Sequence, residues 1–228
     1  MKNLLFLVCV ISSCVLNAQH VAIVPDKNNF CYLGVDNPLT IVAENCPCSQ
    51  LVVKVDNGII NGKDCQYLYR PGNVGRMHIK IQKKNGRKLD SLTEWEFRVW
   101  KIPDPIFKVG PYSNGARVNM AVVTSQRFVR AELEGFDFDA RFKVDSFRFT
   151  IISKDSSVKF TCFNKGNRLR TEVYNGFLKL DVNDILVFDK IHVKGPDDLE
   201  REIDPAKLTV LQVCLVMGPF QQAIIIDD

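Results

Sequence analysis

The residues with the clearest chemical potential in this chain are its cysteines. Eight occur among 228 residues, and six of them follow residue 18: Cys31, Cys46, Cys48, Cys65, Cys162 and Cys214. In an oxidising compartment, an even number of cysteines is typical of a disulfide framework. Four lie in the first half of the chain and two in the second. We therefore expect bridges to form within each half.

The sequence leaves the pairing open. A bond within Cys46-Pro47-Cys48 would strain disulfide geometry, so these two cysteines are expected to bond elsewhere. The first four cysteines then pair in one of two ways. One joins Cys31 to Cys46 and Cys48 to Cys65, and the other joins Cys31 to Cys48 and Cys46 to Cys65. Cys162 and Cys214 stand in strand-like runs and form either a bridge or two buried free thiols.

Metal binding by histidine or cysteine has little support. The three histidines, His20, His78 and His192, are scattered along the chain, which disfavours a zinc site. Cys46-Pro47-Cys48 has no second cysteine pair at zinc spacing. The cysteines are therefore interpreted as disulfide partners, and no metal is predicted.

Two carboxylates raise the question of calcium. Asp137 and Asp139 alternate with Phe136 and Phe138, so in a strand they would share one face about 7 Å apart. Because Arg141 and Lys143 continue that face and neutralise it, a solvated strand face is the better interpretation. The sequence contains no serine elbow, phosphate-binding glycine loop or Cys–His nucleophile pair. We predict no catalytic residue, no cofactor and no small-molecule substrate.

The elements that must position these residues are β-strands. In residues 20–103, seven or eight short apolar runs are separated by turn signals, among them Asp56-Asn57-Gly58, Asn61-Gly62 and Lys83-Lys84-Asn85-Gly86. Met77–Ile81 alternates cleanly between apolar and polar residues. This spacing predicts an immunoglobulin-like sandwich.

The second half has the same character. Phe136 to Lys143 alternates between apolar and charged residues, which predicts a half-buried strand. The phase slips at Asp145-Ser146, where we expect a bend or bulge, and Asn175-Gly176 predicts a turn. Leu208–Met217 is a long apolar run. Ala223–Ile226 either pairs with it or forms a free edge for a partner sheet.

Two prolines divide the halves. Pro103 and Pro105 lack amide donors and fix φ, so no regular ladder continues through Ile102, Pro103, Asp104 and Pro105. The linker is short and is predicted to be stiff. We expect an all-β protein of two immunoglobulin-like sandwiches, residues 19–103 and 104–228.

The N-terminus indicates export. Lys2 precedes an apolar run from Leu4 to Leu16, too short for a membrane-spanning helix. Cleavage after Ala18 is predicted, which places the protein in the periplasm or cell envelope. The alternative is a lipid anchor at Cys14. The net charge of +4 with scattered Lys and Arg argues against nucleic acid as a ligand.

Four stretches together resemble a known family: 24–38, 97–105, 133–147 and 183–205. They are similar to the last two periplasmic domains of GldM, a protein of gliding motility and type IX secretion also known as PorM. The resemblance implies immunoglobulin-like β domains, a homodimer, and envelope partners that include type IX secretion components. It also implies a stand-alone version of the partner-facing end, without the motor helix.

Three functions follow as hypotheses. The first is a non-enzymatic protein-binding module of the envelope. The second is a lipid-anchored structural or adhesive protein, and the third is an enzyme on a β-sandwich scaffold.

Overall fold

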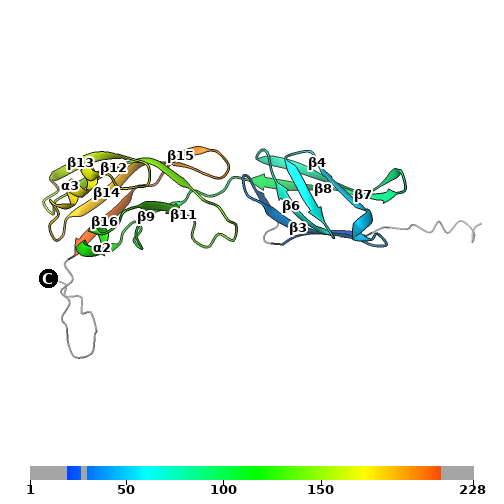
Figure 1. Cartoon of the computed structure of the whole chain (residues 1–228), viewed down its shortest axis with the longest axis horizontal. Helices are drawn as coiled ribbons and strands as arrows, with labels where there is room; N and C mark the ends of the chain where they lie inside the picture. The colour runs from blue at the N-terminus through cyan, green and yellow to red at the C-terminus, as the bar shows by residue number, and fades with distance from the viewer. Residues whose placement is uncertain (1–19, 27–29, 212–228) are drawn as a thin grey trace, which may run out of the picture. The chain divides into compact units, whose positions relative to one another are not determined.

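The computed structural model describes residues 20–26 and 30–211 (Figure 1). Contacts divide the chain into two compact units. The first contains the described residues up to Cys31 together with Asn37–Val99, and the second contains Tyr32–Asp36 together with the chain from Trp100 onward. Strands dominate both units, and no helix in the described part of the chain is long and apolar enough to cross a membrane. The predicted all-β class is confirmed.

The first unit contains two four-stranded sheets. One has the order β1 (Val21–Pro25), β3 (Asn37–Ala43), β6 (Gln66–Arg70), β5 (Ile59–Lys63). The other has the order β2 (Cys31–Tyr32), β8 (Lys88–Trp100), β7 (Gly75–Asn85), β4 (Leu51–Val55), with a short 3-10 turn, η1 (Cys48–Gln50), before β4.

Alternation along these strands builds the core of the first unit. Leu39 and Ile41 of β3 are fully buried, as are Met77, Ile79 and Ile81 of β7. The intervening residues of β7, such as Lys80, face solvent. The predicted pattern of Met77–Ile81 is therefore confirmed as a strand with one buried face.

One turn prediction in this unit is wrong, and another marks a turn that does not close a hairpin. Asn61-Gly62 lies inside β5, and the hairpin turns instead at Asp64-Cys65, whose φ values are 54° and 66°. Two positive φ values in a two-residue loop are typical of a type I′ turn. Asp56-Asn57-Gly58 joins β4 to β5, which lie in different sheets, so it is a crossing rather than a hairpin.

The crossing depends on Gly58. This residue has a φ of +93°, and a Cβ built on it would lie 2.2 Å from the Arg70 carbonyl oxygen. Gly86, in the β7–β8 turn, has a φ of +60° and open space around the same position. Gly86→Ala therefore measures only the energetic cost of a side chain at a positive φ, without a steric clash.

We expect Gly86→Ala to lower the free energy of unfolding by about 1 kcal/mol, and Gly58→Ala by about 2 kcal/mol or more because of the added clash. Urea denaturation of both variants measures the difference. Equal losses would show that the Arg70 carbonyl moves aside at no cost.

The second unit is built on a six-stranded sheet. Its order is β10 (Arg117–Asn119), β16 (Ala206–Leu211), β14 (Ile185–Lys194), β12 (Lys143–Ile152), β13 (Val158–Lys165), with β15 (Glu200–Ile203) also paired to β14. β9 (Ile106–Val109) and β11 (Val129–Glu132) form a separate antiparallel pair. Two short helices, α2 (Met120–Thr124) and α3 (Thr171–Phe177), complete the described part of the unit.

Aromatic side chains fill the core of the second unit. Phe149 and Phe188 lie with ring centroids 5.1 Å apart, and Phe107 packs against Phe147 and Phe188. The register of β12 against β14 shifts on both sides of Ser146. The irregularity predicted at Asp145-Ser146 is thus confirmed.

The prediction of a strand from Phe136 to Lys143 is wrong, but the prediction of which side chains are buried is correct. β12 begins only at Lys143, and residues 136–142 join no ladder with the described part of the chain. Phe138 is nevertheless buried, whereas Asp137 and Asp139 are exposed. Phe138 packs with Val35 and Ile102 in a small core of its own. The alternation reports which side chains are buried, and it says nothing of backbone pairing.

The turn predicted at Asn175-Gly176 is also wrong, because both residues lie in α3. A Cβ on Gly176 would lie 2.7 Å from the Phe160 ring of β13. Gly176 therefore serves close packing of α3 against the sheet rather than a turn.

Candidate functional site

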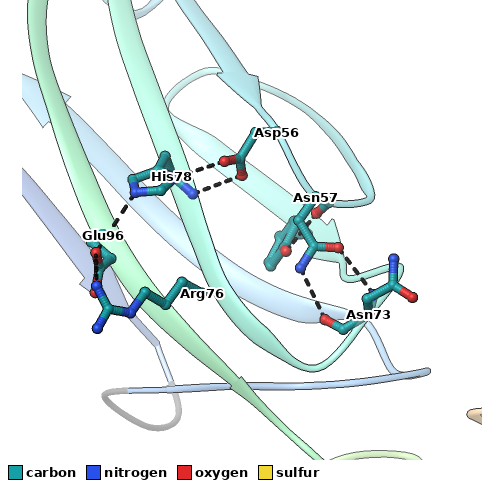
Figure 2. A network of polar contacts seen from close by, with 7 residues as sticks. Asp56, Asn57, Asn73, Arg76, His78 and Glu96 are labelled. Atoms are coloured by element: carbon teal, nitrogen blue, oxygen red, sulfur yellow. Dashed lines mark hydrogen bonds and ion pairs between the residues drawn. The ribbon is translucent and has the colours of Figure 1, made fainter.

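One candidate site is an exposed polar network in the first unit, drawn in Figure 2. Asp56 follows β4, His78 lies on β7, and Glu96 lies opposite His78 on β8. His78 Nδ1 lies 2.6 Å from Asp56 Oδ2, and the His78 backbone N–H donates to Asp56 Oδ1 at 2.8 Å. His78 Nε2 lies 3.7 Å from Glu96 Oε2, which also accepts a hydrogen bond from Arg76 at 3.3 Å.

These contacts favour the charged forms of both partners. The hydrogen bond to Asp56 raises the pKa of His78, with further attraction from Asp56, Glu96 and Glu94. The His78 backbone N–H and then the ring lower the pKa of Asp56. Both ring nitrogens face carboxylates, so neither is free to accept a proton from a nucleophile. The geometry is that of an ion-pair network.

The network makes a pH-dependent prediction. Because the folded pKa of His78 is raised, its contribution to stability is complete below the unfolded value of about 6.5 and is lost as pH rises through the folded pKa. The contribution of Asp56 to stability changes with pH in the opposite direction. Because its folded pKa is lowered, that contribution is complete above the unfolded value of about 4 and is lost as pH falls through the folded pKa.

In an NMR titration of the His78 ring, we expect Asp56→Asn to lower the midpoint more than Glu96→Gln does, because Asp56 makes the shorter contact. Equal shifts of the midpoint in the two variants would show that the raised pKa of His78 depends on the surrounding negative charge and not on the contact with Asp56.

Asn57, beside Asp56, fixes the local backbone. Its Oδ1 accepts from the backbone N–H groups of Gly72 and Asn73, and its Nδ2 donates to the Asn73 carbonyl at 2.9 Å (Figure 2). The Tyr69 hydroxyl donates to the Asn57 carbonyl at 2.6 Å. These bonds have a structural role that the turn signal alone did not predict.

The structure forms one of the bridges that the sequence left open, between Cys48 and Cys65. Cys31 and Cys46, its predicted companions in that pairing, are free and buried. Burial raises the pKa of the Cys31 thiol to about 12, so this thiol stays protonated and unreactive. Cys162 is free and half-buried, and Cys214 lies outside the described residues.

The histidines do not converge on one another. His20 precedes β1, His78 lies on β7 and His192 on β14. In the described ranges no group of three His, Cys, Asp or Glu side chains could hold a metal ion. Cys9 and Cys14, the predicted cleavage after Ala18 and the run Ala223–Ile226 all lie outside the described residues.

The linker residues are fastened within the second unit. Ile102 is 2% exposed and belongs to the core around Phe138. Arg201 donates to the Ile102 carbonyl at 3.0 Å and pairs with Asp104 at 3.2 Å. Its second guanidinium nitrogen binds the buried carboxylate of Asp197. Pro103 and Pro105 flank Asp104, so hydrogen bonds as well as prolines define this segment.

The second unit also carries two pockets that meet at Tyr174, on α3. The first, of about 680 Å³, is bounded chiefly by apolar side chains of α2, α3 and the chain that follows α3. The second, of about 620 Å³, is bounded by four cations: Arg127, Lys165, Arg168 and Arg170. Sequence reasoning missed both pockets, because their residues are distant in the chain and α3 was not predicted.

Comparison with known families accounts for both units. The model of the GldM third domain matches residues 20–100, and that of the GldM C-terminal domain matches residues 103–211. The chain belongs to the GldM family. The matched residues confirm the resemblance expected from the sequence, and they support two β-sandwich domains. The GldM family works in the type IX secretion and gliding machinery of the envelope.

Other comparisons add little. No match was found among curated proteins. Among solved structures, the chain is similar to the adhesin InvE of Yersinia pseudotuberculosis, at 13% identity and a TM-score of 0.27. The match covers 85% of this chain and 58% of the adhesin chain. A likeness at that TM-score carries no weight for function.

Proposed function

We propose that this GldM-family protein is a non-enzymatic protein-binding module of the periplasmic face of the envelope, working with the type IX secretion and gliding machinery. The observation that supports it is the presence of both terminal GldM domains in one chain, at 20–100 and 103–211. The first-unit network supports the non-enzymatic part, since its histidine is occupied by two carboxylates.

Affinity capture tests this proposal. The exported chain, purified with its disulfide intact, is used as bait in detergent extracts of the envelope, and the captured proteins are identified by mass spectrometry. An unrelated exported β-sandwich protein of similar net charge is the control bait. We expect enrichment of secretion or gliding components over the control. Capture of none of them in repeated extracts would refute the proposal.

A further inference from the structure

We infer that the two adjoining pockets of the second unit form one binding site for a partner segment in which acidic residues adjoin aliphatic ones. The inference rests on the proposed function, because it names the chemistry of the protein partner. It is carried by a cluster of cations that form no ion pair within the described part of the chain, by the hydrogen bonds that hold this cluster in place, and by the apolar pocket beside it.

The cations of the basic pocket have no ion-pair partner within residues 20–26 and 30–211. No ion pair joins Arg127, Lys165, Arg168 or Arg170 to a carboxylate among the residues that the structure describes. The single carboxylate in the lining is Glu172. Several other cations of the same unit are paired, among them Lys108 with Glu134 and Arg148 with Asp189. Gathering like charges opposes folding, so an external anion is the natural complement of this pocket.

The loop that carries three of these cations is held by a buried amide. Asn164 is 1% exposed, and its Nδ2 donates to the carbonyls of Gly166 and Arg168 at 2.9 and 3.0 Å. Its Oδ1 accepts from the Arg170 backbone N–H at 2.9 Å. The backbone from 166 to 170 is therefore fixed before any ligand arrives, which lowers the entropic cost of binding.

Arg127 is brought to the same loop by backbone pairing. The Leu169 N–H donates to the Arg127 carbonyl at 2.9 Å, and the Val129 N–H donates to the Asn167 carbonyl at 2.8 Å. Tyr174 adds a tie from α3, because its hydroxyl donates to the Gln126 carbonyl at 3.0 Å. Three separate segments thus surround one pocket.

The second half of the site is apolar and begins at the same tyrosine. Tyr174 lines both pockets, and the apolar one continues along Met120, Leu178 and Val182. Leu178 is 87% exposed and Val182 is 37% exposed. Exposed aliphatic side chains that border a pocket are typical of protein-binding surfaces. The basic pocket on one side and the apolar pocket on the other are complementary to a segment with acidic residues at one end and aliphatic residues at the other.

The shape favours a peptide over other anions. A pocket of about 620 Å³ bounded by four cations is far larger than one phosphate group needs. A lipid bilayer presents a broad face that does not enter a concave pocket. An extended peptide places alternate side chains about 7 Å apart, and its carboxylates suit the two-pronged hydrogen bonding of arginine.

The direct test is fluorescence anisotropy with a labelled peptide in which a run of Glu precedes a run of Leu and Ser. Arg168→Glu with Arg170→Glu is expected to weaken binding roughly tenfold or more, because both charge-assisted contacts are reversed. Lys154→Glu with Lys207→Glu, two exposed cations of the same unit, is the matched control and is expected to change affinity less than about twofold. Leu178→Ser is expected to weaken binding by roughly threefold to tenfold.

Several results would overturn the inference. Equal losses of affinity in the Arg168→Glu, Arg170→Glu variant and in the Lys154→Glu, Lys207→Glu control would show that binding depends only on the net charge of the protein. Displacement of the peptide by inorganic phosphate at an equal concentration of charge would show that the site binds anions in general and does not recognise a peptide. Tighter binding of phosphatidylglycerol vesicles than of the peptide, lost with Arg168→Glu and Arg170→Glu, would assign the surface to lipid. Self-association lost in that variant would assign it to a second copy.

Affinity capture separates this inference from the proposed function. If the wild-type chain and the Arg168→Glu, Arg170→Glu variant capture the same envelope proteins, the site is refuted and the function stands. If the wild-type chain captures none while the peptide still binds at Arg168 and Arg170, the proposed function fails and the site stands. We expect capture by the wild type and its loss in the variant.

Discussion

Phe149→Ala is expected to lower the free energy of unfolding of the second unit by about 3–5 kcal/mol. Phe149 lies on β12 at the centre of the core and is fully buried. Its ring lies 5.1 Å from that of Phe188, 5.5 Å from Phe177 and 6.3 Å from Phe160, between ring centroids. Truncation removes these contacts and leaves a cavity that the surrounding strands cannot fully close.

Hydrogen exchange of the slowest amides in β12 and β14 measures this loss without assuming that the two units unfold together. Phe163→Ala is the matched control, since Phe163 lies on the neighbouring strand β13 and is 65% exposed. We expect its effect to stay within about 0.5 kcal/mol. A loss under about 1 kcal/mol for Phe149→Ala would contradict the central place given to this ring.

The sequence predicted buried faces better than backbone paths. Burial selects side-chain type directly, which is why the alternation of Met77–Ile81 and the inward positions of Phe136 and Phe138 were both visible in the sequence. Strand pairing depends on a distant partner, so the sequence did not show that β12 begins only at Lys143. The buried neighbours of Phe138, Val35 and Ile102, are far away in the chain.

Turn predictions failed at positions where glycine is required by a close tertiary contact rather than by a turn. Gly62 stands in β5 because the backbone of Tyr67 comes too close for a side chain, with a Cβ placed 2.6 Å from the Tyr67 Cα. Gly176 stands in α3 because the Phe160 ring covers it. Both needs are tertiary contacts, and an Asn-Gly pair read locally cannot reveal them.

The candidate binding site could not be predicted because it depends on a long-range arrangement. Arg168 and Arg170 looked like scattered surface charge, and only the pairing of residues 127–129 with 167–169 brings Arg127 beside them. No sequence pattern pointed to Asn164, although it is the buried amide that holds the basic loop. The sequence did suggest a binding module, and that suggestion came from family resemblance rather than from these residues.

Removal of the Cys48–Cys65 bridge is expected to destabilise the first unit by about 3 kcal/mol. The bridge closes a loop with a sequence separation of 17 residues, and cross-links of that span restrict the unfolded chain by roughly this amount. It joins η1 to the turn between β5 and β6, so it connects the segment before one sheet to an outer hairpin of the other. Cys48→Ala with Cys65→Ala, compared with wild type by urea denaturation under oxidising conditions, measures the effect.

A reductant provides the matched control and tests the pairing itself. Dithiothreitol should destabilise the wild-type chain by a similar amount and leave the Cys48→Ala, Cys65→Ala variant unchanged. Cys31→Ala should keep the sensitivity to reductant, because Cys31 is a free thiol in the structure and is protonated at neutral pH. A variant without Cys48 and Cys65 that still responds to dithiothreitol would require a second bridge, either Cys31 with Cys46 or Cys162 with Cys214.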